Sequence, residues 1–159
     1  MMRSILVLLL CLVSAACAVQ DVDVRVREVD VRILTSGLQC GKSKGVTVVE
    51  LGSRKELGVL LPALMPGDLA AAFNSERVFV ISMGLHSTAG YSLSLAHTRA
   101  RLEHDVVTIP LTWHEPARGA ITAQVITQPC LIVVLEKHQY AEVRVVDQSG
   151  VERARLVLH

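Results

Sequence analysis

The stretch RVFVISMGLHSTAGY, from Arg77 to Tyr91, decides the fold that this sequence indicates. It begins with a run of apolar and β-branched residues, which is typical of a buried strand. A loop of mostly small residues follows over residues 84–90, and a second strand is predicted to open at Tyr91. Glycine at both ends of the loop permits backbone angles that other residues avoid. The side chains of Ser87 and Thr88 can bond their own backbone and hold a tight turn.

Further strands are predicted on both sides of this stretch. Upstream, apolar and charged residues alternate from Val22 to Ile33, and the phase of the alternation flips at Arg27-Glu28, which predicts a bulge or a tight bend. Pro110 lies inside a predicted strand and indicates an edge position or a bulge there. The predicted strands beyond Ile33 are residues 46–51, 77–83, 91–101, 106–113, 121–126, 131–136, 141–146 and 151–158. Short strands at near-regular spacing predict an all-β fold, a mainly antiparallel sandwich or partly closed barrel.

One short helix is predicted between the strands. Pro66-Gly67-Asp68 leads into an alanine-rich segment, residues 69–73, and proline and aspartate at the front of such a run favour a helix start. We expect three of its apolar side chains to cap an end of the sheet core: Leu69, Ala72 and Phe73.

The first eighteen residues differ in kind from the rest of the chain. Residues 1–18 combine a short positive start, an apolar run over residues 5–13 and a patch of small residues, which is the pattern of a secretory signal peptide. Cleavage at the small-residue patch would give a soluble chain that starts at Val19. Alternatively, Cys17 would be the lipidated first residue of a bacterial lipoprotein. Either way, residues 19–159 suit a single mainly-β domain.

Charge and composition exclude some classes of partner. Removal of Arg3 with the signal peptide leaves equal numbers of basic and acidic residues. A neutral chain without basic runs lacks the electrostatic footprint of a nucleic-acid-binding protein. Aromatic residues are scarce, which argues against stacking platforms for bases. We therefore expect no nucleic-acid partner, and contact with a membrane only through a lipid anchor at Cys17.

Two cysteines remain beyond the signal region, Cys40 and Cys130. A lone pair in an oxidising compartment predicts a disulfide. The alternative is two buried thiols that never meet. A catalytic cysteine is not favoured, because neither residue lies beside a predicted helix start or a basic cluster that would lower a thiol pKa.

The sequence indicates no catalytic or metal-binding constellation. His97, His104 and His114 lie on or beside consecutive predicted strands, but no pair has the spacing of a zinc motif. His86 and Ser87 are adjacent, so on an extended chain they point to opposite sides and form no nucleophile–base pair. The Gly-x-Ser-x-Gly elbow of hydrolases does not occur. We therefore expect no enzyme activity, no metal and no cofactor.

The segment 77–136 resembles the C-terminal domain of the PrcB family, subunits of bacterial exported protease complexes. An apolar strand runs into Gly84, and the turn Thr88-Ala89-Gly90-Tyr91 stands where the family has a Thr-Gly-Gly-Tyr-type turn. Downstream, Thr127-Gln128-Pro129-Cys130 leads into a further apolar strand. Ala89 departs from the family pattern in place of glycine, and Cys130 stands where the family usually has an aromatic residue.

The resemblance implies a non-catalytic partner that supports the maturation or stability of an exported protease in the bacterial periplasm or cell envelope. A loop of small residues suits close approach by another chain, and exposed sheet edges suit the addition of an extended strand. The residues that the resemblance assigns to partner binding are Gly84, Thr88, Ala89, Gly90, Tyr91 and Pro129. Alternatively, these residues only fix a hairpin, with Tyr91 in the core.

Two further functions are open from the sequence. Residues 86–91 also resemble the loop by which chagasin-type inhibitors plug the cleft of cysteine proteases. However, the chain lacks the second and third loops of those inhibitors, and Trp113-His114-Glu115-Pro116 is a poor substitute for the third. The other alternative is a structural envelope lipoprotein, which would need a lipidated Cys17.

Overall fold

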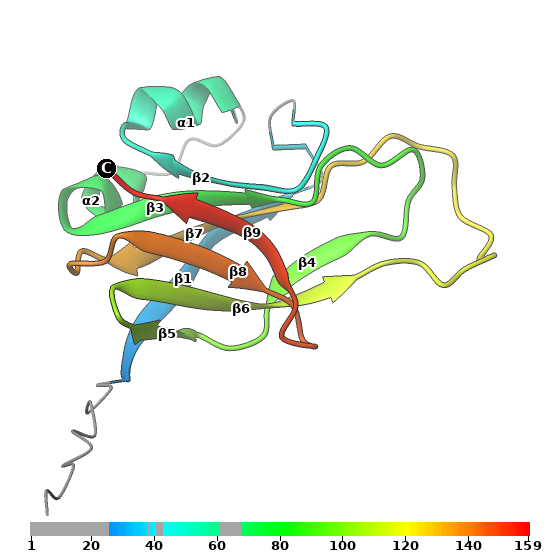
Figure 1. The fold of residues 1–159 in the computed structure, drawn as a ribbon. Helices are drawn as coiled ribbons and strands as arrows, with labels where there is room; N and C mark the ends of the chain where they lie inside the picture. The colour runs from blue at the N-terminus through cyan, green and yellow to red at the C-terminus, as the bar shows by residue number, and fades with distance from the viewer. Residues whose placement is uncertain (1–25, 38, 41–42, 61–67) are drawn as a thin grey trace, which may run out of the picture.

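The computed structural model describes residues 26–37, 39–40, 43–60 and 68–159. Within these ranges it contains nine strands and two helices (Figure 1). Their bounds are β1 Arg27–Gly37, β2 Thr47–Leu51, α1 Arg54–Leu60, α2 Asp68–Ser75, β3 Glu76–Ser82, β4 Ser92–Leu95, β5 Arg99–Glu103, β6 Val106–His114, β7 Cys130–Glu136, β8 Glu142–Val146 and β9 Glu152–Val157. The predicted signal peptide, Cys17 and the residues from Val22 to Arg25 lie outside the described part.

The strands form one strongly curled sheet. Its order is β2-β3-β7-β1-β5-β6-β8-β9, and β4 pairs separately with β6. All of the pairings are antiparallel except that of β6 with β8. The end strands β2 and β9 contact each other, so the sheet closes nearly into a barrel (Figure 1). The prediction of an all-β, mainly antiparallel and partly closed barrel is therefore confirmed.

β3 and β7 are buried on both faces, which explains why their sequences are almost continuously apolar. Phe79 and Ile81 of β3 point into the inner core of the curled sheet. Val78 and Val80 point to the other face, into an outer core that the two helices cover. The outer core comprises Cys40, Leu51, Leu57, Ala72, Val78, Val80, Cys130, Ile132 and Val134. The curled sheet thus has two packed faces at β3 and β7.

The described part of the structure contains two helices, whereas the sequence predicted one. α2 is the predicted helix, and its Ala72 and Phe73 pack into the outer core, on a face of the sheet instead of at its end. The side chain of Leu69 lies outside the described part. α1 was not predicted, although it has a start signal. The Ser53 hydroxyl accepts from Glu56 N at 3.3 Å, as at a capped helix start. The Glu56 carboxylate accepts from Gly52 N at 2.9 Å, one residue before the cap.

The predicted strand over residues 91–101 is wrong as one element. It is split into β4 and β5, both of which pair with β6. The break lies opposite Pro110, whose carbonyl accepts from Ala96 N at 3.0 Å. Pro110 has no amide proton to hold a continuous ladder. It lies in a strand flanked on both sides, so the predicted edge position is wrong. The pairing next to Pro110 is broken between β4 and β5, without the predicted bulge in the register of β6.

The bulge or tight bend predicted at Arg27-Glu28 is not found in the pairing of these residues. Both residues pair regularly with β5, opposite Leu102 and Arg101. A register shift lies further along β1, next to Ile33, where the strand has already turned to β7. β1 therefore pairs with β5 through its first residues and with β7 through its later ones.

A buried carboxylate holds the turn between β8 and β9. Asp147 is 5% exposed, and it accepts hydrogen bonds from Ser149 N at 2.8 Å, Val151 N at 3.0 Å and Arg153 Nε at 2.8 Å. Burial raises the pKa of Asp147, but these hydrogen bonds and the Arg153 charge outweigh burial, so the pKa lies below its usual value. The turn is therefore stabilised by the charged form of Asp147.

We expect Asp147→Asn to lower the melting temperature at neutral pH and to lower it by a smaller amount in acid. A carboxylate whose pKa is depressed by folding contributes stability above its unfolded pKa of about 3.9, and loses it as the pH falls further. Thermal unfolding of both proteins between about pH 7 and about pH 3 checks this. Asp105→Asn, in the exposed turn between β5 and β6, is the control. A difference that persists unchanged in acid would contradict the role of the charge.

Candidate protein-binding arm

Two loops project side by side from one end of the curled sheet (Figure 1). The first joins β3 to β4 and the second joins β6 to β7. In Figure 1 they extend beyond the strands as the green and yellow segments on the right. We call residues 84–91 and 115–129 together the arm. The predicted strand over residues 121–126 is wrong, because this segment runs in the second loop of the arm without strand pairing.

Backbone hydrogen bonds join the two loops. His86 and Thr127 exchange two of them, at 2.8 and 2.9 Å. The Thr127 hydroxyl donates to the Thr88 carbonyl at 3.0 Å, and Ala89 N donates to the Ala123 carbonyl at 3.0 Å. These bonds satisfy backbone groups that would otherwise need water. The two loops therefore form one connected projection.

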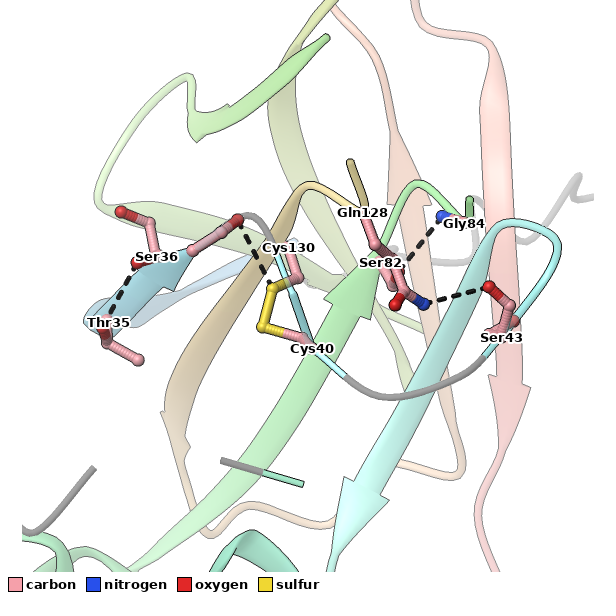
Figure 2. Close-up of a disulfide and its surroundings, with 9 residues drawn as sticks. Thr35, Ser36, Cys40, Ser43, Ser82, Gly84, Gln128 and Cys130 are labelled. Carbon is pink, nitrogen blue, oxygen red and sulfur yellow. Dashed lines mark hydrogen bonds between the residues drawn. A yellow bond between two sulfur atoms is a disulfide. The ribbon is translucent and has the colours of Figure 1, made fainter. Parts of the chain in front are cut away.

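The base of the arm is fixed to the sheet at several points. Met83 N donates to the Pro129 carbonyl at 2.9 Å. The buried Gln128 donates from Nε2 to the Ser43 carbonyl at 3.0 Å, as Figure 2 shows. Gly84 N donates to the Ser82 hydroxyl at 3.1 Å. The arm is thus tied to β3 and to the loop before β2.

A disulfide between Cys40 and Cys130 lies at the same base (Figure 2). Cys130 is the first residue of β7 and directly follows the arm, and the Cα atoms of the pair are 5.8 Å apart. Both side chains are buried in the outer core. The disulfide joins the segment after β1 to the place where the arm re-enters the sheet.

Three of the six residues assigned to partner binding shape the arm from within. Gly84 and Pro129 are buried at its base. The Tyr91 ring stacks on the His86 ring, with centroids 3.7 Å apart and planes 15° apart, and it packs against the inner core. Three more of these residues lie further out, half-buried or exposed: Thr88, Ala89 and Gly90. Their part in partner binding stays a prediction.

Four other side chains of the arm are apolar and exposed, and the sequence analysis did not assign them to the site. Leu85 is 44% exposed, Val125 48% and Ile126 68%, and Ile121 is fully exposed. Residues 121, 123 and 125 alternate as in a strand, which led to the strand prediction. A strand also needs a partner edge, and the second loop extends beyond its neighbours. The alternating side chains therefore face solvent.

The described residues offer no metal centre and no membrane-spanning helix. Across residues 26–37, 39–40, 43–60 and 68–159, no group of three or more histidine, cysteine, aspartate or glutamate residues could hold a metal ion. His97, His104 and His114 are therefore not brought together as ligands. Within the same ranges, neither helix has the length and apolar character needed to cross a bilayer.

The segment that carries the arm also carries a family match. Residues 77–136 match the family model PrcB C-terminal. This confirms the resemblance seen in the sequence. The match covers less than half of the chain, and it extends from β3 to the end of β7, with both loops of the arm inside it. No curated protein and no solved structure matches the chain.

Proposed function

We propose that this chain is a non-catalytic, exported protein-binding subunit that supports an exported protease, with the arm as its contact surface. The PrcB C-terminal match supports the link to a protease complex. The observation that carries the proposal is the arm itself, which exposes Leu85, Val125, Ile126 and Ile121 on a projection fixed to the sheet.

The exposed side chains suit binding of another protein. Exposed apolar side chains gathered on one projection indicate an interaction site, and contact with a partner removes their surface from water. The hydrogen bonds between the two loops and at the base hold the projection together. A surface ordered before binding loses little conformational entropy when a partner docks. The arm therefore combines apolar contact area with an ordered backbone.

We expect the double substitution Leu85→Asp and Ile126→Asp to weaken partner capture by about 30-fold or more, because the loss of even one hot-spot side chain costs about 2 kcal/mol or more. The fold should persist, since both side chains face solvent. Tagged wild-type and variant protein are used to isolate partners from envelope extract, and an exported protease is quantified by mass spectrometry. Val59→Asp in α1, where the side chain is 77% exposed, is the matched control.

Two results would contradict this proposal, and a third would favour a different function. Equal recovery of the protease with wild-type and arm variant would contradict the arm as the contact surface. No protease with any of the proteins would contradict the subunit role. Inhibition of a papain-like protease by the purified chain would instead favour a chagasin-type inhibitor. The mass of the exported chain shows whether it begins at Val19 or at an acylated Cys17.

A further inference from the structure

Among the described strands, β1 has no partner along part of one backbone edge. On the edge that pairs with β5, the last hydrogen bond along β1 runs from Val31 N to the Thr98 carbonyl, at 2.8 Å. From Arg32 to Gly37 it pairs only with β7, on the opposite edge. Backbone groups of a strand alternate in direction, so Ile33 N points to the same side as Val31 N. A donor of β1 therefore faces away from β7 with no strand beside it in the described part of the chain.

β4 also has an edge without a partner among the described strands, and β1 and β4 border the same cleft. It pairs with β6 over residues 92–95, and no described strand pairs with its other edge. Its sequence is Ser-Leu-Ser-Leu, without charge or proline. Sheet edges that must stay unpaired are usually protected by charged residues, proline or bulges. β4 has none of these features in its sequence, although it is short.

A cleft of about 680 Å³ lies where these two edges diverge. Residues 30–33 line one wall and residues 95–98 the other. Ile33 is 42% exposed in this wall, and Leu95 is half-buried against the inner core. The walls therefore offer backbone donors and acceptors together with apolar surface.

The charged side chains around the cleft are already paired. Arg32 binds Glu76 at 2.8 Å, and Arg99 binds Glu28 at 2.6 Å. Asp30 lies 4.0 Å from Arg99. Since each of these charges has a partner within the protein, backbone hydrogen bonding and apolar contact remain as the means of recognition. Both suit an extended polypeptide.

The strands that wall the cleft, β1 and β4, also lead to the arm. β4 begins directly after Tyr91, the last residue of the first loop. β1 ends at Gly37, which pairs with Cys130 at the base of the second loop. The free edge runs from Arg32 to Gly37 and contains the register shift between Ile33 and Thr35, so it is regular only up to Ile33. A partner seated on the arm can therefore extend a segment along this edge.

We propose that the cleft between β1 and β4 binds an extended segment of the partner polypeptide, which adds to the free edge of β1 as a strand. This inference rests on the proposed function, because it names the kind of segment that the partner contributes. The segment hydrogen-bonds to Ile33 N through its backbone, and alternate side chains pack on Ile33 and Leu95.

The test uses a library of short linear peptides displayed on phage, selected on the mature chain. The best binder is synthesised, and its affinity is measured by calorimetry. Hydrogen exchange should slow at Ile33 when the peptide binds, while the outer edge of β9 keeps its rate. A peptide N-methylated at alternate residues should bind at least about tenfold more weakly, since it loses backbone hydrogen bonds to the edge of β1.

Protein variants separate the cleft from the arm. Ile33→Pro removes the amide donor and should abolish peptide binding. The N-methylated peptide tests the same hydrogen bonds without a change in the protein. The arm variant with Leu85→Asp and Ile126→Asp should keep peptide affinity and lose the protease. Failure to select any peptide, unchanged affinity after N-methylation, or protection away from Ile33 would overturn the cleft proposal and leave the arm proposal standing.

Discussion

Replacing Cys40 and Cys130 together with alanine is expected to lower the free energy of unfolding by about 4–5 kcal/mol. The two cysteines are 90 residues apart in the chain. On the chain-entropy model, a cross-link over such a loop restricts the unfolded state by about this amount. Alanine is chosen because both side chains are buried in an apolar cluster. For a domain of this size the loss corresponds to a melting temperature lower by roughly 10–20 °C.

Thermal unfolding followed by circular dichroism measures this effect. Wild-type protein treated with a reductant that opens the disulfide should unfold near the temperature of the double variant. The double variant itself should not respond to reductant. Equal melting temperatures for wild type and variant would contradict a stabilising disulfide. Because the bond closes the base of the arm, the variant should also exchange backbone protons of the arm faster in the folded state.

The sequence predicted most strands because their patterns are set by local geometry. β3 and β7 are continuous apolar runs, as strands buried on both faces must be. Val29 and Val31 of β1 are buried as their alternation with charged residues predicted. The match at residues 77–136 agrees with the resemblance read from the turn and the strands around it.

The errors arose where tertiary pairing overrides local pattern. Residues 91–101 have strand character throughout, but Pro110 on the neighbouring strand breaks the ladder between β4 and β5. Residues 121–126 alternate like a strand but meet no strand edge. α1 was missed for a different reason, because its start signal at Ser53 and Glu56 lay in the sequence and was not used.

The sequence located the loop from residue 84 to 91, but it did not show which side chains of that loop are exposed. Gly84 and Tyr91 do lie in the arm, where they hold its base and pack its interior. The exposed Leu85 and Ile126 could not be identified, because exposure depends on which loops lie together in space. The cleft beside β1 depends on the point where that strand changes partner, which no local pattern encodes.

Gly84→Ala is expected to lower the free energy of unfolding by about 2–5 kcal/mol, the sum of backbone strain and steric overlap. Gly84 has φ +84°, in the left-handed region that residues with a Cβ rarely adopt. A Cβ at this position would lie 2.7 Å from Gly45 C and 2.7 Å from Lys44 O. Both are backbone atoms, so no side-chain rotation relieves the overlap.

Gly119→Ala separates the two contributions. Gly119 has φ +82°, nearly the same as Gly84, but its added Cβ would meet nothing within 4 Å. It should therefore cost only the left-handed strain of about 1–2 kcal/mol. Denaturant unfolding of both variants measures the difference, and equal losses would show that contact with Lys44 and Gly45 is unimportant. A larger loss for Gly84→Ala would mean that this glycine is required because the arm begins in direct contact with the loop before β2.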